Sequence, residues 1–277
     1  MRAWRRLVPL VSLGLVVAGC SRAVSPVERV EWPVMGTVAA VQCRGGGTAP
    51  AALASSVRRT FEAVQSVLNA HNPTSEISRL AALPAAELLA RCTPAMRPCY
   101  EAALRLAQQS GNAFDPRWRG AGTLDLGAIA KGFAVDLAVH DVMTAGADLL
   151  VDLGGNLKSA QGCWRTGVQS PTGAGLSARV ELRPGEALAT SAEYFRGKHI
   201  CDGRTHSPVS NDVASVTVLH PSSAMLADGL STTLFVLGTA DGAEFLSRHY
   251  PDAAALWELK GGGTFARDPH NRFALCR

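Results

Sequence analysis

Aromatic residues and net charge are both scarce in this sequence. Phe, Trp and Tyr make up 6% of the 277 residues, and the formal net charge at pH 7 is only +4. Lys and Arg are scattered along the chain and form no basic stripe with interleaved aromatic residues. Such a stripe is typical of nucleic-acid-binding proteins, where it meets the phosphate backbone. The sequence therefore predicts a protein that does not bind nucleic acid.

Long hydrophobic runs are also lacking. The apolar run from Leu7 to Ala18 is shorter than the roughly 20 residues that a membrane-spanning helix needs. Arg2, Arg5 and Arg6 precede it, which is the layout of a secretory signal. We therefore expect residues 1–19 to be a signal peptide.

The predicted signal ends at Cys20, directly after two small residues. This junction resembles the cleavage and lipidation site of bacterial lipoproteins, and a polar segment containing Pro26 follows it. The resemblance implies that residues 20–29 form a lipidated tether. It also implies an exported protein on the periplasmic side, anchored to the bacterial membrane through lipid on Cys20. An ordinary signal with a coincidental cysteine is the alternative.

No Cys/His spacing typical of a zinc site occurs, although six cysteines follow Cys20. In an exported protein an even number of cysteines permits disulfide bonds, whose pairing the sequence does not determine. Cys92 and Cys99 are the best local pair because Pro94 and Pro98 give the segment between them a loop-like character. Several buried free thiols are the alternative. The six cysteines are Cys43, Cys92, Cys99, Cys163, Cys201 and Cys276.

Helical and extended patterns mix without a regular alternation, which predicts an α+β fold. We expect one domain over residues 30–277, with mixed or antiparallel sheets and packed helices. Helical spacing predicts helices over residues 51–70, 96–109, 128–144 and 224–237, a short helix capped by Thr74 or Ser75, and a last helix that ends at His249. Extended patterns predict strands over residues 34–43, 149–153, 164–169, 178–182, 187–191, 199–202 and 214–220, and a hairpin over residues 254–267.

The segment from Leu124 to Asp136 is the centre of the predicted site. It has the pattern of a short buried strand, a glycine turn and a helix that begins at Ala128. Asp125 lies at the end of the strand and Lys131 in the first turns of the helix. The N-terminus of a helix offers unpaired N–H groups and the positive end of a dipole, which suits a phosphate. With the strand at residues 149–153, the segment would form a βαβ unit.

Asp228 and Thr232 are four residues apart in a predicted helix, so their side chains share one face. A carboxylate and a hydroxyl are hard oxygen ligands, which Mg²⁺ accepts beside substrate phosphates. The alternative is that Thr232 bonds within its own helix and Asp228 is solvated.

His199 precedes Ile200, Cys201 and Asp202. Histidine is the usual general base near neutral pH, and a neighbouring carboxylate could orient it. The alternative is a structural or surface histidine.

Several short motifs, taken in order, resemble the ApbE family of FAD:protein FMN transferases. Together they span most of the chain after the predicted signal. They are residues 34–37, 72–80, 113–116, 124–136, 152–156, 189–191, 199–205 and 227–238.

The resemblance implies a Mg²⁺-dependent enzyme that binds FAD in a cleft between subdomains and splits its pyrophosphate. It would attach FMN through a phosphoester bond to a Thr or Ser of an exported acceptor protein, with release of AMP. His199 matches the residue that takes the proton from the attacking hydroxyl. The positions that match FAD contacts are Met35, His71, Ala113, Phe114, Asp115, Asp125, Lys131 and Ile200, and His71 stands where the family often has tyrosine. The positions that match metal ligands are Asp228, Thr232 and the backbone carbonyl of Ala128.

Two other functions remain open at this point. The same site could hydrolyse FAD to FMN and AMP with water as the nucleophile. A flavin-binding lipoprotein without turnover is the third possibility, although a pure carrier needs neither a metal ligand nor a base.

Overall fold

The computed structural model describes residues 26–45, 49–143, 146–173, 175–193 and 200–276. The predicted signal peptide, the lipidation site at Cys20 and the predicted base His199 lie outside these ranges. The predicted tether overlaps the first strand, which begins at Val27.

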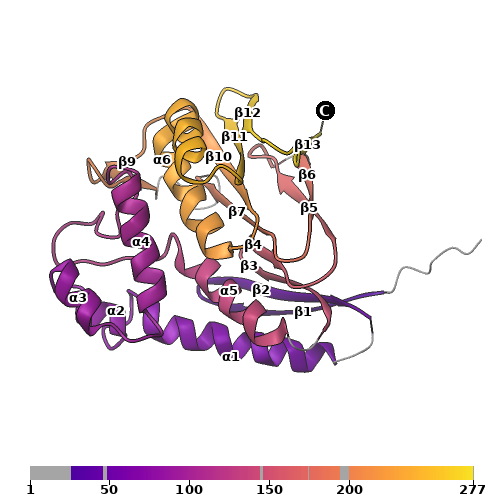
Figure 1. The fold of residues 1–277 in the computed structure, drawn as a ribbon, viewed down its shortest axis with the longest axis horizontal. Coiled ribbons are helices and arrows are strands. Elements are labelled where there is room, and N and C mark those ends of the chain that lie inside the picture. The colour runs from indigo at the N-terminus through magenta and orange to yellow at the C-terminus, as the bar shows by residue number, and fades with distance from the viewer. Residues whose placement is uncertain (1–25, 46–48, 144–145, 174, 194–199, 277) are drawn as a thin grey trace, which may run out of the picture.

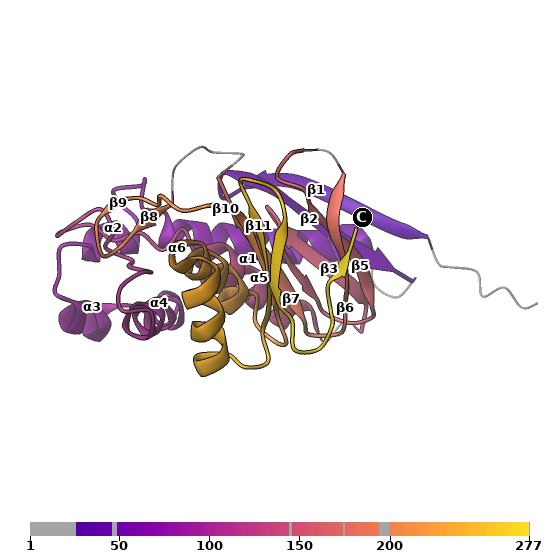
Figure 2. The same cartoon turned by 90° about the horizontal axis from the view of Figure 1, so that it is seen from above.

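The described residues form helices on one side of a large antiparallel sheet and a smaller sheet on the other (Figures 1 and 2). The helices are α1 (Pro50–Leu68), α2 (Glu76–Leu80), α3 (Ala85–Arg91), α4 (Arg97–Gln109), α5 (Ala130–Val142) and α6 (Ala224–His249). The eight-stranded sheet has the order β1 (Val27–Val34), β2 (Thr37–Arg44), β3 (Asp148–Leu153), β4 (Asn156–Ser159), β7 (Ala187–Ala192), β10 (Val213–His220), β11 (Ala254–Leu259) and β12 (Thr264–Arg267). The three-stranded sheet has the order β13 (Ala274–Leu275), β6 (Leu176–Leu182) and β5 (Trp164–Gln169), and β8 (Cys201–Asp202) pairs with β9 (Ser207–Pro208).

Every strand pair among the described residues is antiparallel, so the predicted α+β class is confirmed. Two hydrophobic cores result. The larger one lies between the helices and the large sheet, and the smaller one joins the two sheets through residues such as Trp164 and Leu256. Figures 1 and 2 both place α2, α3, α4 and the β8–β9 pair together at one end of the molecule.

The first hairpin differs from the prediction of a single strand over residues 34–43. β1 and β2 pair along their whole length, and Val34 lies opposite Thr37. Met35 and Gly36 between them both have positive φ, 50° and 68°. Two consecutive positive φ values define the type I′ turn, whose twist matches that of the flanking strands. The segment from 34 to 37 is therefore a turn.

The predicted helix over residues 51–70 is confirmed as α1. Leu53, Val57, Phe61, Val64 and Leu68 are all buried, as expected for residues at helical spacing on one face. This face packs on the β1–β2 hairpin and on α5.

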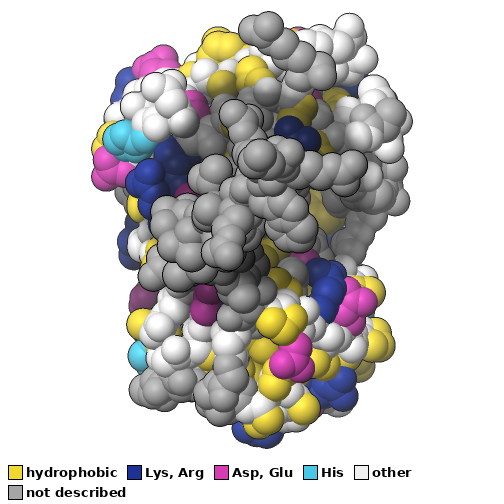
Figure 3. Space-filling view, turned by 90° about the vertical axis from the view of Figure 1, so that its right-hand side faces the viewer, with side chains coloured by type: hydrophobic (Ala, Val, Ile, Leu, Met, Phe, Trp, Pro, Cys, Tyr) yellow, Lys and Arg dark blue, Asp and Glu magenta, His cyan; other side chains and the backbone are white. Residues whose placement is uncertain are grey.

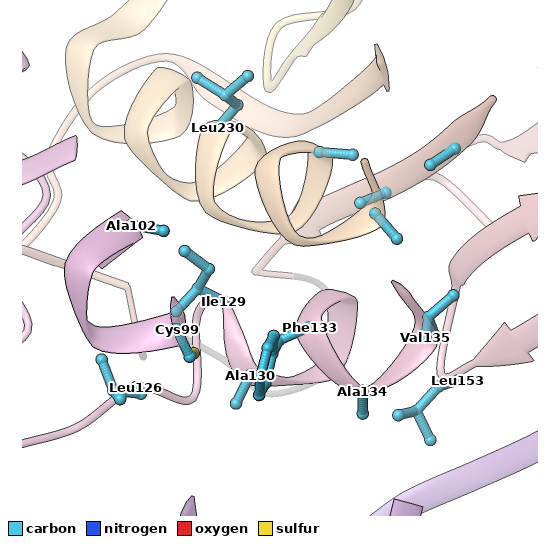
Figure 4. Close-up of a cluster of buried hydrophobic side chains, with 14 of the residues drawn as sticks. Cys99, Ala102, Leu126, Ile129, Ala130, Phe133, Ala134, Val135, Leu153 and Leu230 are labelled. Atoms are coloured by element: carbon cyan, nitrogen blue, oxygen red, sulfur yellow. The ribbon is translucent and has the colours of Figure 1, made fainter. Parts of the chain in front are cut away.

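The segment before α5 is not a strand, so the predicted βαβ unit is wrong. Leu124 and Leu126 are buried, but they pair with no described strand. The Asp125 N–H donates instead to the carbonyl of Pro116, at 2.8 Å, and α5 begins at Ala130 rather than Ala128. Figure 4 shows Leu126 and the first residues of α5 beside α4 and α6. Burial in a loop produced the apolar pattern that a buried strand also gives.

Helices α5 and α6 cross in close contact at Gly132. A Cβ atom on Gly132 would lie 2.1 Å from the carbonyl oxygen of Ala224, so only glycine permits this approach. One turn further along α5, the Asp136 carboxylate accepts hydrogen bonds from the N–H groups of Ala224 and Met225, at 2.8 and 3.0 Å. A carboxylate at a helix N-terminus satisfies free N–H groups and complements the dipole. The two helices are thus fixed to each other at the start of α6.

Several smaller predictions have definite outcomes. Ser75 rather than Thr74 caps α2, the helix over 96–109 is confirmed as α4, and the hairpin over 254–267 is confirmed as β11–β12. Of the strand predicted over 199–202, Cys201 and Asp202 form β8, Ile200 precedes it, and His199 lies outside the described residues. The helix predicted over 224–237 and the last helix to His249 are the two parts of α6, and Gly238 between them has non-helical φ and ψ, 77° and −167°, so the predicted break is confirmed. Cys92 and Cys99 are buried free thiols, so the proposed disulfide between them is wrong.

In the described ranges no helix is long and apolar enough to cross a membrane. On the face shown in Figure 3, Lys and Arg side chains are interspersed with acidic and apolar ones.

Candidate functional site

A cleft of about 1040 Å³ lies where the loops before α5 meet the start of α5, the first turns of α6, and the strands β4, β5 and β7. Its walls come from segments far apart in sequence, including residues 113–119, 125–131, 154–157, 167–169 and 188–192. The strand pair β8–β9 adds Cys201 to the rim. The fold therefore brings one cavity into contact with most of the segments singled out in the sequence.

Ten of the twelve predicted site residues line this cleft. They are His71, Ala113, Phe114, Asp115, Asp125, Ala128, Lys131, Ile200, Asp228 and Thr232. Met35 does not line it and lies in the β1–β2 turn, where its N–H donates to Gln65 Oε1 at 2.6 Å. Thr37, two residues further along, does line the cleft. His199 is outside the described residues, and the next residues, Ile200 and Cys201, line the cleft.

Asp228 lies at the contact between α5 and α6. Its side chain is almost fully buried, and its Oδ2 accepts a hydrogen bond from the Gly132 N–H at 2.9 Å. The Lys131 ammonium is 3.4 Å from both carboxylate oxygens and also donates to the carbonyl of Gly127 at 3.1 Å. Burial raises the pKa of Asp228, and the neighbouring Lys131 opposes that rise. The alternative of a solvated Asp228 is therefore wrong.

Thr232 lies one turn further along α6, on the same side as Asp228. Its hydroxyl is 2.9 Å from the Ser191 hydroxyl at the end of β7, and Ser191 is also 2.7 Å from Ser231 Oγ. The hydroxyls on either side of Thr232 bond back within the helix: Ser231 donates to Asp228 O and Thr233 to Gly229 O, both at 2.8 Å. The alternative reading of Thr232 is thus also wrong. Thr232 and Ser191 both line the cleft.

Internal hydrogen bonds hold the loop over residues 113–123 in place. The Phe114 N–H donates to Ser110 Oγ at 3.1 Å, and Asp115 Oδ1 accepts from the Arg117 N–H at 2.8 Å. The Arg117 guanidinium donates to the backbone carbonyls of Ala81, Leu83 and Thr123, at 2.7–3.1 Å. Arg117 therefore fixes the loop through three hydrogen bonds to backbone carbonyls.

Gly203 closes this loop from the β8–β9 side. A Cβ atom on it would lie 2.3 Å from the Asp115 Cβ and 2.5 Å from the carbonyl oxygen of Asn112. Its N–H donates to the carbonyl of Ala113 at 3.2 Å. Glycine at this position allows the two loops to touch beside the cleft.

Trp118 and Arg119 are cleft residues that the sequence reasoning missed. The Arg119 guanidinium is 3.3 Å from Asp125 Oδ2 and lies over the Trp118 ring, 4.7 Å from its centroid. The other oxygen of Asp125 accepts a hydrogen bond from the Gly127 N–H at 2.8 Å. The available signal was an Arg beside one of the few aromatic residues, a short distance before the predicted phosphate-binding turn.

The charges of the cleft favour a bound cation. Its lining includes three carboxyl groups, on Asp115, Asp125 and Asp228, and two basic side chains, those of Arg119 and Lys131. No group of three or more His, Cys, Asp and Glu side chains suited to a metal occurs in the described part of the chain. A set made of one carboxylate, one hydroxyl and one carbonyl oxygen still fits Mg²⁺, which usually keeps several waters and substrate phosphates as ligands. Asp228 Oδ1, whose single partner among the described side chains is Lys131, fits such a role.

Solved structures share this fold. A flavin transferase ApbE from Vibrio cholerae aligns with a TM-score of 0.73 and 23% identity over 87% of this chain and 97% of that chain. A flavinyl transferase ApbE from Pseudomonas stutzeri aligns with a TM-score of 0.71 and 24% identity over 88% of this chain and 94% of that one. At such identities the likeness establishes the fold.

Curated relatives match at higher identity over shorter segments. The FAD:protein FMN transferase of Rhodobacter capsulatus is 40% identical over 131 residues, which are 43% of this chain and 25% of that protein. The protein of the same name from Vibrio cholerae is 36% identical over 134 residues, 43% of this chain and 40% of the relative. The chain thus spans less than half the length of these relatives.

The model of the ApbE family matches residues 35–122 and 118–257, which are most of the described structure and include all the described lining of the cleft. The chain belongs to the ApbE family.

Proposed function

We propose that this protein is a Mg²⁺-dependent FAD:protein FMN transferase. It would bind FAD in the cleft, break the pyrophosphate bond and attach FMN through a phosphoester to a Thr or Ser of an exported acceptor protein, with release of AMP. The observation that carries the proposal is the convergence of Asp228, Lys131 and Thr232 at one cleft whose family relatives bear that name.

The size of the cleft supports a dinucleotide as the ligand. Pockets for small ligands have volumes of about 300–1,000 Å³, and this cleft reaches about 1040 Å³. The proposed FAD contacts line its walls, with Phe114 and Asp115 on the loop before α5 and Ile200 beside β8. His71 also lines the cleft and can stack on a flavin ring.

The phosphates would lie at the start of α5. There the first N–H groups of the helix carry the positive end of its dipole. Lys131 in the first turn adds a full positive charge, and Arg119 is the second cation of the described lining. Both charges stabilise the negative charge that concentrates on the phosphoryl oxygens in the transition state.

Asp228, Thr232 and the Ala128 carbonyl would hold the magnesium ion. When bound, Mg²⁺ would act as a Lewis acid toward the diphosphate and orient it. The chain's own contribution is to fix the ligands: Gly132 N–H orients the Asp228 carboxylate, and Ser191 orients the Thr232 hydroxyl. His199 is proposed as the base that takes the proton of the attacking acceptor hydroxyl.

The proposed location follows from the N-terminal sequence. A signal peptide over residues 1–19 and lipid on Cys20 would place the enzyme on the periplasmic side of the bacterial membrane. We expect the Cys20→Ser variant to lose membrane association in a cell-fractionation experiment. An unchanged membrane fraction would refute the lipid anchor.

The experiment combines the full chain with FAD, Mg²⁺ and an acceptor domain that carries one flavinylation threonine. Covalent flavin fluorescence of the acceptor on a denaturing gel and AMP in the same tube are the two readouts. Labelled acceptor together with AMP establishes the transferase. AMP and free FMN without labelled acceptor would instead identify an FAD pyrophosphatase, and bound FAD without either product would identify a flavin carrier.

A further inference from the structure

A second cavity of about 570 Å³ lies beside the cleft, at the end of the gap between the two sheets. The β5–β6 turn closes it on one side and the β11–β12 turn on the other. Its lining includes Ser170, Thr172, Ser177, Glu193, Glu258 and Lys260.

Residues adjacent in the sequence line the two cavities. Gln169 and Ala192 line the cleft, and the next residues, Ser170 and Glu193, line the second cavity. Ala192 also pairs with Ser215 in the β7–β10 register, and Ser215 Oγ donates to the Glu258 carboxylate at 2.6 Å. The ends of β5 and β7 therefore border both the cavity and the proposed FAD cleft.

The second cavity carries one net negative charge. Its charged lining is Glu193, Glu258 and Lys260. Glu258 is buried and accepts hydrogen bonds from the hydroxyls of Ser177 and Ser215. Lys260 Nζ is 3.2 Å from Glu193 Oε2, which leaves the other carboxylate in excess.

Glu193 Oε1 has no hydrogen-bond partner among the described residues, although it is buried. The whole side chain of Glu193 is only 10% exposed. A buried acceptor without a partner destabilises the folded state, so native structures rarely leave one. A ligand with an N–H donor and a positive charge would satisfy this oxygen and balance the charge.

We propose that this cavity binds a basic side chain of the acceptor protein, together with the backbone that flanks it. This inference rests on the proposed transferase function. The volume of this cavity is many times the roughly 30 Å³ that one water molecule occupies, so the cavity suits a peptide segment better than a single ion. Because the cavity adjoins the cleft and an extended chain advances about 3.3–3.6 Å per residue, the basic residue would lie a few positions from the modified Thr or Ser.

The test uses the full chain with FAD, Mg²⁺ and a set of acceptor domains. Each acceptor has one flavinylation threonine and one lysine, placed in turn at each position within about five residues of that threonine. The reference acceptor has glutamine at all these positions. We expect one lysine position to raise kcat/KM for FMN transfer about tenfold, which is the effect of about 1.4 kcal/mol.

The Glu193→Gln variant should lose this preference for lysine and keep its affinity for FAD. Glu181→Gln is the matched control, because Glu181 is a half-exposed carboxylate of β6 outside both cavities. Thr172→Trp, in the exposed β5–β6 turn, is a second variant that fills the cavity without touching the carboxylates. It should lower kcat/KM for every acceptor and leave FAD binding unchanged.

The outcomes of this test distinguish failure of the docking site from failure of the transferase function. Equal rates for lysine and glutamine acceptors, or a lysine preference that survives in Glu193→Gln, would overturn the docking site while the transferase stands. Inhibition by free n-butylamine without any lysine preference would identify a small-amine site instead and would also overturn it. Transfer to none of the acceptors by the wild-type protein would refute the proposed function itself.

Discussion

The Gly132 N–H on α5 donates a hydrogen bond to the Asp228 carboxylate on α6, at 2.9 Å. This bond is possible because the backbones of the two helices touch at Gly132, where a Cβ atom would collide with Ala224 O and lie 2.8 Å from the Asp228 Cβ. One close helix contact therefore fixes both the packing of the core and the orientation of the proposed metal ligand.

Gly132→Ala should destabilise the protein and impair the site together. The added methyl group must push α6 away, and overpacking of this kind costs about 1–3 kcal/mol. Urea unfolding measures the loss of stability, and FAD titration measures the effect on the cleft. Gly261→Ala is the control, since a Cβ atom there meets nothing within 4 Å and the residue does not have positive φ. Equal stability of the two variants would contradict the close contact.

Asp228→Asn should abolish most of the activity without unfolding the protein. The amide keeps the volume of the side chain and an oxygen to accept from Gly132, but it removes the charge that would hold Mg²⁺ beside the diphosphate. We expect FMN transfer to fall at least about 100-fold, the size of effect seen when one transition-state contact is lost. Asp241→Asn, at an exposed position further along α6, is the control. Full activity of Asp228→Asn in the AMP assay would refute the site.

The sequence predicts those parts of the fold that local pattern determines. The apolar face of α1, a cap of α2 at Thr74 or Ser75 and the β11–β12 hairpin follow from spacing and turn residues, and the structure confirms all three, with Ser75 as the cap. The extended segment at Leu124 and Leu126 was mistaken for a strand because a buried loop beside helices has the same apolar pattern.

The candidate site also has parts that local sequence patterns predict and parts that depend on contacts between distant residues. The common face of Asp228 and Thr232 can be predicted from their spacing of four residues, because residues at this spacing lie on one side of any helix. The Thr232–Ser191 contact joins residues 41 positions apart, and no local pattern contains it. Arg119 and Trp118 were also missed, because their place in the cleft depends on how the 113–123 loop folds back toward α5.

Arg119→Gln should weaken FAD binding more than FMN binding. The guanidinium beside Asp125 is proposed to contact the diphosphate, and a charge-assisted hydrogen bond contributes about 1.5–3 kcal/mol. A loss of about tenfold or more in the Kd for FAD is expected by fluorescence titration. Arg44→Gln is a close control, since Arg44 also lies over a Trp ring, that of Trp164 at 3.8 Å, and pairs with Asp148 at 3.4 Å, outside the cleft. Similar affinities for FAD in both variants would exclude Arg119 from the site.

The stability of the fold should fall as the pH drops from about 6.5 to 4. Burial lowers the pKa of His220 to about 4, against the attraction of Asp136 for the charged form. Nδ1 of the neutral ring accepts hydrogen bonds from the N–H groups of Ser222 and Ser223, at 3.2 and 3.0 Å. Between the two pKa values the unfolded chain binds a proton that the folded protein does not, so unfolding becomes easier as the pH falls.

The full effect of His220 amounts to about 3 kcal/mol, since each pKa unit corresponds to about 1.4 kcal/mol. Urea unfolding at pH 7.5, 6, 5 and 4 measures it. His220→Asn is the informative variant, because the amide oxygen replaces Nδ1 as an acceptor and does not titrate in this range. The wild-type protein should lose more stability than His220→Asn over the same pH interval. Parallel curves for the two proteins would show that the acid sensitivity comes from other groups.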